Sequence, residues 1–208
     1  ARRQEIAELA RRYNLQIIED DCYAISETDM PSYRVLAPDR VWYLGSMTKA
    51  VSSALRFGYL VPPEGRAQMA RHVAQSNFYG VPQPIQDICA ELIQSGQAGA
   101  IRDNVLKVIA ARVQLAVNLL GSWNIRWRRD LPFIWLKLPQ GWRGSTFVRA
   151  CDADGIRIKS ADEYTLPDGQ APNAVRIALA PNVPEADLRA ALQTMCDLLA
   201  NPPYLVEN

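Results

Sequence analysis

The stretch that decides the fold is Ile17-Ile18-Glu19-Asp20-Asp21-Cys22-Tyr23, where a short apolar run ends abruptly in three acidic residues. Open parallel sheets carry their ligand-binding groups at the carboxyl ends of apolar strands, and this stretch has that character. The run Arg40-Val41-Trp42-Tyr43-Leu44 repeats the pattern and leads into Gly45-Ser46-Met47-Thr48-Lys49. Residues 56–61 are expected to form a third strand. The sequence therefore predicts an α/β region built on a parallel-type sheet.

The segments on either side of these strands predict helices and then a second module. Apolar residues recur at helical spacing ahead of the first strand, at positions 6, 9, 10 and 13. Residues 101–120 predict one long helix, and residues 133–138 alternate as a half-buried antiparallel strand does. We expect two domains: residues 1–100 as a partial αβ domain, and residues 101–208 as a smaller α+β domain connected by the long helix.

The composition excludes several classes of protein. The chain has 208 residues, 49% hydrophobic and 22% charged, with a formal net charge of +1. No apolar run approaches the roughly 20 residues of a membrane helix, so no membrane partner is expected. The balanced charge gives no electrostatic footprint for nucleic acid. One histidine and four scattered cysteines make a metal site unexpected and indicate a reducing, cytoplasmic location.

One lysine lies where a cofactor lysine is needed. Among the four lysines, at positions 49, 107, 137 and 159, only Lys49 follows directly on a predicted strand end. Asp20 and Tyr23 follow the preceding strand. Pyridoxal phosphate (PLP) needs a carboxylate on its ring nitrogen, a donor to its phenolate oxygen and a lysine on its aldehyde carbon. Taken singly, each residue is better explained as a solvated loop lysine, a turn acid or a packed ring.

Four motifs together resemble one family. Residues 17–23, 45–49 and 55–60, with Ala171-Pro172-Asn173-Ala174-Val175-Arg176-Ile177, resemble fold-type I PLP-dependent aminotransferases of class I and II. They look most similar to the aminotransferase-like domain of MocR-type GntR transcriptional regulators. The motifs occur in the family's order and spacing over essentially the whole chain. The resemblance implies a PLP-dependent transferase fold in which residues 1–100 are part of the large domain and residues 101–208 are the small one.

The resemblance also implies roles for individual residues. Lys49 becomes the lysine bound covalently to PLP, Asp20 the partner of its ring nitrogen and Tyr23 the donor to its 3′ oxygen. Asp20 is preferred to Asp21 because Asp-x-x-Tyr is the family spacing. The phosphate ligands become Ser46 and Arg56, since an arginine can bind a phosphate through two parallel hydrogen bonds. In the second module, Arg176 matches the arginine that binds a substrate α-carboxylate.

The chain resembles only the second half of the family's catalytic-type domain. The family's Asn-x-Pro-x-Gly segment, glycine/serine phosphate loop and ring-stacking aromatic residue all precede the point where this sequence starts. The resemblance also places an absent upstream strand between the strands that end at Asp20 and Ser46. We therefore expect residues 101–208 to form a complete domain, and residues 1–100 to be strained, rearranged or completed by a second chain. PLP is expected in the full-length protein and is expected to be absent or weakly held by this fragment.

Two functions fit these residues. The first is the PLP-binding effector domain of a bacterial GntR/MocR regulator, a homodimer that senses an amino acid or amine and contacts DNA only through an upstream domain. The second is part of a free-standing aminotransferase, which moves an amino group between an amino acid and a 2-oxo acid. A basic winged-helix segment upstream would indicate the regulator. We interpret His72 as a structural histidine and the basic cluster Arg126, Arg128 and Arg129 as a solvated hairpin face.

Overall fold

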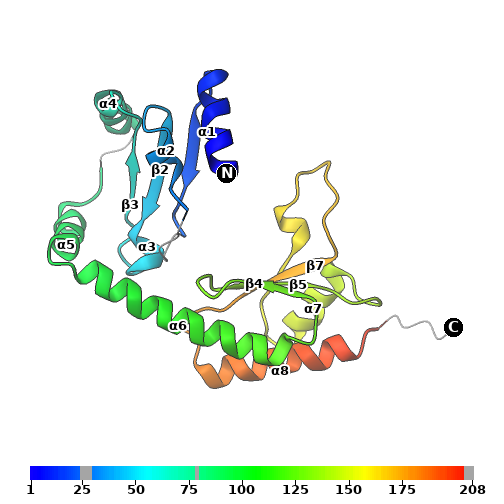
Figure 1. Ribbon diagram of the computed structural model, residues 1–208. Coiled ribbons are helices and arrows are strands. Elements are labelled where there is room, and N and C mark those ends of the chain that lie inside the picture. Colours follow the sequence, from blue (N-terminus) through cyan, green and yellow to red (C-terminus); the bar gives the residue numbers. More distant parts are fainter. Residues whose placement is uncertain (24–29, 78–79, 204–208) are drawn as a thin grey trace. The chain divides into compact units, whose positions relative to one another are not determined.

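The computed structural model describes residues 1–23, 30–77 and 80–203 of the chain. The chain divides into two compact units, Ala1–Leu106 and Lys107–Asn208 (Figure 1). The boundary falls inside the long helix α6 (Gln97–Leu120), which contains the predicted helix 101–120 and begins four residues earlier. Each unit has its own sheet, so each is described by itself.

The first unit contains a three-stranded sheet with β2 in the middle. Strands β1 (Ile17–Asp20) and β2 (Val41–Ser46) run parallel, and β3 (Gly58–Val61) pairs with β2 in the antiparallel direction. Helices α1 (Arg2–Arg12) and α2 (Tyr33–Leu36) pack with this sheet through a core of Ala7, Ala37 and Val41. Three further helices complete the unit: α3 (Met47–Ala50), α4 (Ala67–Asn77) and α5 (Gln83–Gln94).

Strands β1 and β2 are direct neighbours, so no place is left between them for the upstream strand that the resemblance implied. Their register runs from Ile17 opposite Val41 to Asp20 opposite Leu44. The ladder continues beyond β1, where the Asp21 N–H donates to the Leu44 carbonyl over 2.9 Å. The prediction of an intervening strand was therefore wrong. The acidic stretch and the lysine segment follow adjacent strands, which brings them closer than the sequence argument assumed.

Two local expectations in the first unit are also corrected. In α1 the sheet-facing residues are Ala7 and Ala10, whereas Ile6, Leu9 and Tyr13 are 36%, 47% and 61% exposed. The third strand begins at Gly58 instead of residue 56. Arg56 has a φ of 48°, in the left-handed region, and so cannot continue an extended strand.

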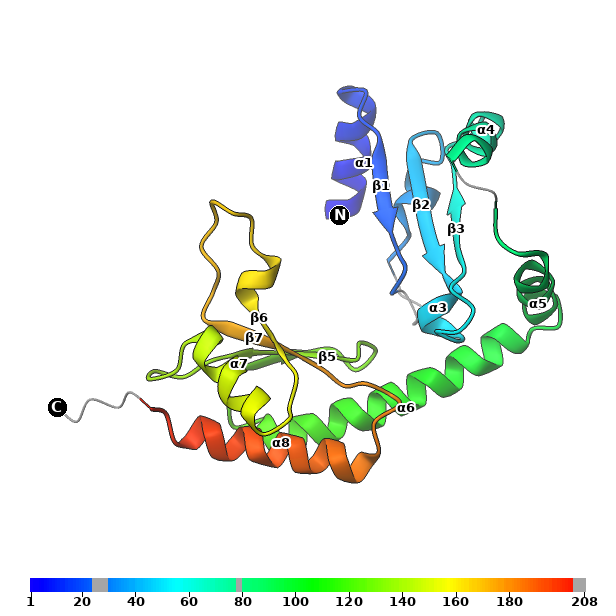
Figure 2. The ribbon, with the colours of Figure 1, turned by 180° about the vertical axis from the view of Figure 1, so that it is seen from behind.

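The second unit is a four-stranded antiparallel sheet in the order β4-β5-β7-β6, with helices packed against it (Figure 2). Its strands are β4 (Ile125–Trp127), β5 (Phe133–Lys137), β6 (Lys159–Ser160) and β7 (Ala174–Ala178). Its helices after α6 are α7 (Gly144–Ala153), the 3-10 helix η1 (Ala161–Tyr164) and α8 (Glu185–Ala200). The predicted alternation in β5 is confirmed, since Ile134 and Leu136 are fully buried.

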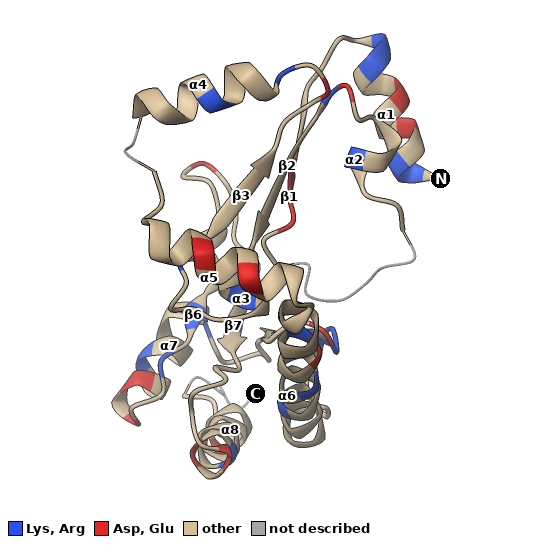
Figure 3. Cartoon of the chain, turned by 90° about the vertical axis from the view of Figure 1, so that its left-hand side faces the viewer, with Lys and Arg blue, Asp and Glu red and all other residues tan. Residues whose placement is uncertain are grey.

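Two of the helices carry charges of both signs. Figure 3 shows basic and acidic residues interspersed along α1 and α8. Within the described residues, no helix is long and apolar enough to cross a membrane, and no cluster of three or more potential metal ligands occurs.

Candidate functional site

The carboxyl ends of β1 and β2 present the predicted acidic and hydroxyl groups at one edge of the sheet. Asp20 ends β1 and Ser46 ends β2, and the two strands are hydrogen-bonded neighbours. The strands end there because the apolar residues give way to acids in one case, and to a helix start at Met47 in the other. This is the edge at which open α/β sheets bind ligands.

The structure distinguishes Asp20 from Asp21. The Asp20 side chain is exposed and accepts hydrogen bonds from the thiol and the backbone N–H of Cys22, with the N–H at 3.1 Å from Oδ1. These bonds hold the pKa of the Asp20 carboxyl below its usual value, so the group stays ionised. Asp21 instead accepts the hydroxyl hydrogen of Tyr43 over 2.9 Å. Asp21 is thereby engaged by a side chain, while Asp20 is engaged only within its own turn.

Lys49 and Tyr23 lie together. Lys49 is the third residue of α3, and its Nζ lies 5.1 Å from the centroid of the Tyr23 ring. That distance is within the range of a cation–π contact. Among the described residues, no acidic side chain forms an ion pair with Lys49. The Lys49 amine therefore lies beside the Tyr23 phenol, and it is not engaged in a salt bridge within the described residues.

Ser46 and Arg56 are linked through the loop that joins α3 to β3. Ser46 caps α3 by accepting the Thr48 N–H over 3.1 Å, and its hydroxyl donates to the Phe57 carbonyl over 3.1 Å. Arg56 directly precedes Phe57 and is exposed in a left-handed conformation. A serine hydroxyl has one proton, so Ser46 could donate to a phosphate only by leaving Phe57.

Tyr43 and Tyr59, which were not among the predicted site residues, lie with Gly45 on β2 and β3 next to this edge. Gly45 lies opposite Tyr59 in the β2–β3 register, and a Cβ on Gly45 would lie 2.3 Å from Cζ of the Tyr59 ring. The rings of Tyr59 and Tyr43 are 6.4 Å apart. Burial first, and then the hydrogen bond to Asp21, raise the pKa of the Tyr43 phenol well above its usual value. The alternation of Tyr43 and Gly45 in the strand is a signal that could have identified this face.

Arg176 lies in the second unit, on β7. Its guanidinium lies over two rings, 4.6 Å from the Phe133 centroid and 5.0 Å from the Tyr164 centroid. Its Nε is buried without a hydrogen-bond partner. A buried donor without a partner is costly, and Arg176 is half-buried with no acid beside it among the described residues, so Arg176 is suited to binding an anionic group.

A cavity of about 1070 Å³ in the second unit does not include any of the predicted site residues. It lies around the start of α7 and is lined by residues such as Arg143, Gly144, Asp162 and Asn173. Two of its polar side chains are already paired: the Asn173 amide accepts from the Gly144 N–H and donates to the Trp142 carbonyl, and Asp162 accepts from Ser160.

The donor set at the edge of the first sheet fits PLP. It offers an ionised carboxylate at Asp20, an amine at Lys49 without an acidic partner, and a phenol at Tyr23 beside that amine. A pyridine nitrogen, an aldehyde carbon and a phenolate oxygen require these three groups. None of the other lysines, at positions 107, 137 and 159, follows a strand of this sheet.

Comparison with known proteins identifies the family of the chain. The model of the family described as "Aminotransferase class I and II" matches residues 1–195. A Bacillus subtilis protein described as the HTH-type transcriptional regulator YdfD is 31% identical over 190 residues, which cover 86% of this chain and 38% of that protein. The mitochondrial kynurenine/alpha-aminoadipate aminotransferase of Rattus norvegicus is 28% identical over 151 residues, covering 66% of this chain and 35% of that enzyme. The chain thus spans well under half the length of these curated relatives.

Solved structures show the same fold. The multiple substrate aminotransferase of Thermococcus profundus has a TM-score of 0.81 at 20% identity, over 96% of this chain and 51% of that one. The alpha-aminoadipate aminotransferase LysN of Thermus thermophilus has a TM-score of 0.80 at 21% identity, over 95% and 53%. The expected fold-type I architecture is confirmed, and so is the resemblance to both regulators and enzymes. The chain belongs to the class I and II aminotransferase family.

Proposed function

We propose that this chain is the PLP-binding, aminotransferase-like effector part of a bacterial transcriptional regulator of the GntR/MocR type. The observation that carries the proposal is the placement of the Lys49 amine beside the Tyr23 ring, at the edge where Asp20 ends the neighbouring strand. The similarity to proteins described as HTH-type transcriptional regulators supports a regulatory setting. PLP is implied by the family and the fold.

Each predicted residue has a defined task in this proposal. Lys49 binds the aldehyde carbon of PLP, Asp20 accepts a hydrogen bond from the protonated ring nitrogen, and Tyr23 donates a hydrogen bond to the ring oxygen. Ser46 and Arg56 contribute to binding the phosphate. Arg176 donates paired N–H hydrogen bonds to the α-carboxylate of an amino acid. When bound, PLP supplies an electron sink for charge that develops at the substrate carbon.

The electrostatics of Asp20 suit its task. The hydrogen bonds from Cys22 keep the Asp20 pKa low, so its carboxylate is charged at neutral pH and can hold a proton on a pyridine nitrogen. Asp21 is tied to Tyr43 and does not compete for that position. The register that makes Asp20 the ring-nitrogen partner is the one that these contacts support.

In the regulator, occupancy of this site by an amino acid or amine changes the affinity for DNA, which is bound through a part of the protein outside this chain. We propose that the whole regulator is a homodimer and acts in the cytoplasm. A free-standing aminotransferase is the second candidate, favoured by the similarity to the kynurenine/alpha-aminoadipate enzyme. In that case Lys49 would act as the general base that takes the proton from the substrate Cα, and PLP would supply the electron sink for that step.

The test compares the two outputs on the whole protein and on its Lys49→Ala variant. DNA affinity is measured by fluorescence anisotropy with and without PLP and an L-amino acid mixture, and amino-group transfer to 2-oxoglutarate is measured in parallel. A ligand-dependent change in DNA affinity that Lys49→Ala abolishes supports the regulator. Rapid amino-group transfer that Lys49→Ala abolishes, with no ligand-dependent change in DNA affinity, identifies the enzyme. If Lys49→Ala changes neither DNA affinity nor amino-group transfer, both assignments are wrong.

A further inference from the structure

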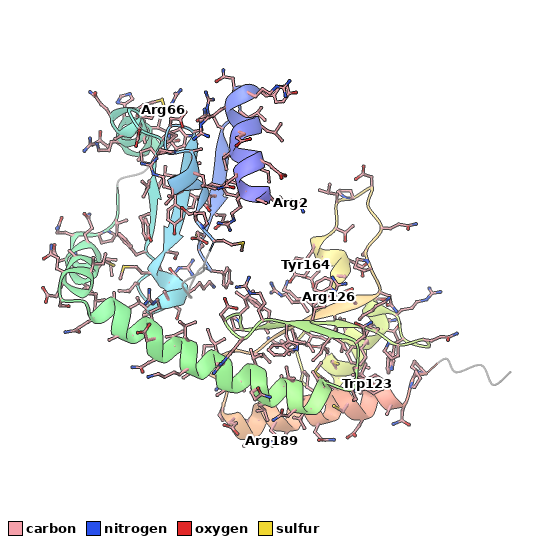
Figure 4. The ribbon with its side chains drawn as sticks, in the orientation of Figure 1. Arg2, Arg66, Trp123, Arg126, Tyr164 and Arg189 are labelled. Atoms are coloured by element: carbon pink, nitrogen blue, oxygen red, sulfur yellow. The ribbon has the colours of Figure 1, made fainter. Side chains whose placement is uncertain are left out.

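The Arg176 guanidinium is held by aromatic rings and not by an acid. Phe133 lies on β5, opposite Ala178 and therefore diagonal to Arg176 on the same face of the sheet. Tyr164 belongs to η1, which packs against β7 (Figure 4). The two ring centroids are 4.6 and 5.0 Å from the guanidinium carbon. Both distances are within the range in which a ring face attracts a cation.

The turn that carries Tyr164 is fixed by its own hydrogen bonds. The Ser160 hydroxyl caps η1, and the Thr165 hydroxyl donates to the Ala161 carbonyl over 3.2 Å. The Thr165 N–H donates to the Asp162 carbonyl over 3.2 Å. These bonds fix the backbone of the turn that carries the Tyr164 ring. Tyr164 is 48% exposed, so the core does not depend on it.

The charge around Arg176 is left unbalanced. Lys159 lies opposite Arg176 in the β6–β7 register, but Lys159 is ion-paired with Glu163 on η1. Among the described residues, Arg176 forms no ion pair, and its Nε has no hydrogen-bond partner. Glu163 is thus paired with Lys159, and the donors of Arg176 remain available for an anion.

We propose that Tyr164 and Phe133 are positioning residues for the carboxylate-binding Arg176, and that the Tyr164 ring sets the preference for amino acids over the corresponding amines. This inference rests on the proposed function, because it assigns the anion as an α-carboxylate. Ring faces restrict the guanidinium without occupying its N–H groups, which an acidic partner would do. A cation that is ordered in advance loses less conformational entropy on binding, so the carboxylate binds more tightly.

The test uses a matched pair of ligands that differ only by the carboxylate. Binding of L-phenylalanine and of 2-phenylethylamine to the PLP-loaded whole protein is measured by calorimetry for wild type, Tyr164→Ala, Tyr164→Leu and Tyr164→Phe. Loss of one cation–π contact should weaken L-phenylalanine about five- to tenfold in Tyr164→Ala and Tyr164→Leu. Tyr164→Phe should match wild type, and 2-phenylethylamine should bind equally to all four. Equal weakening of both ligands, or no weakening of either, would contradict the inference.

Two further measurements separate this inference from the proposed function. In Arg176→Lys the preference for L-phenylalanine should disappear, and its persistence would overturn the carboxylate role of Arg176 itself. If Arg176→Lys removes the preference and Tyr164→Ala does not, only the positioning role is wrong.

The Arg176 Nε–H resonance in the NMR spectrum provides a readout that needs no ligand or cofactor. It should shift in Tyr164→Ala and stay in place in the exposed-tyrosine control Tyr13→Ala; an unmoved resonance in Tyr164→Ala would refute the contact.

Discussion

Replacing Gly45 by alanine should loosen the β2–β3 pairing through one contact. The added Cβ would lie 2.3 Å from Cζ of Tyr59, whereas carbon atoms pack at about 3.5–4.0 Å, so the ring must retreat by more than about 1 Å. Tyr59 is 44% exposed and can turn into solvent, which forfeits its packing on Gly45 and on Tyr43. The lost aromatic contact and the residual crowding together predict a cost of about 1–2 kcal/mol.

Amide hydrogen exchange on peptides that cover β2 and β3 measures this cost locally. Exchange in Gly45→Ala should be roughly 5–30 times faster than in wild type. Gly58→Ala is the matched control, because its Cβ would come no closer than 3.4 Å to any atom, the Gly45 carbonyl oxygen. In a Tyr59→Ala background, Gly45→Ala should cost almost nothing, since the obstacle is gone. An equal cost in both backgrounds, or an equal effect in the control, would refute the reasoning.

Two other perturbations have defined outcomes. Tyr43→Phe removes the 2.9 Å hydrogen bond to Asp21 and should lower the free energy of unfolding by about 1 kcal/mol, because the site is partly exposed; urea denaturation checks it, and an unchanged midpoint would show that the bond contributes nothing. Burial raises the pKa of the Cys151 thiol from 9.0 to about 12, so the unfolded chain releases this proton first. The contribution of Cys151 to stability should be constant below about pH 9 and fall above it, by about 1.4 kcal/mol at pH 10. Denaturation from pH 7 to 10 should therefore show a steeper decline for wild type than for Cys151→Ala, and parallel declines would contradict the assignment.

The strand ends were predictable because their signals are local. An apolar run that gives way to acids marks the end of β1, and a run that gives way to small residues marks the end of β2. The long helix and the alternating strand β5 were likewise visible as periodicity. The adjacency of β1 and β2 was not visible, since strand pairing joins residues more than 20 positions apart and depends on the whole sheet.

Side-chain burial in α1 shows a second limit. Periodicity predicted the helix, but the larger residues Ile6 and Leu9 are substantially exposed while Ala7 is buried against Ala37 and Val41. Small residues allow the helix to approach its neighbours closely, so the contact surface follows their positions and not the apolar stripe. The aromatic setting of Arg176 had no sequence signal, because Tyr164 reaches it from a turn 12 residues away.

The central claim is that Lys49 is the residue that binds PLP. The most direct measurement is the absorbance spectrum of the whole protein titrated with PLP, for wild type, Lys49→Ala and the control Lys137→Ala, which lies at the exposed end of β5. An absorbance band of lysine-bound cofactor, near the edge of the visible range, should form in wild type and in Lys137→Ala. The band should be absent from Lys49→Ala. The same band in Lys49→Ala, or no band in wild type at saturating PLP, would contradict the account.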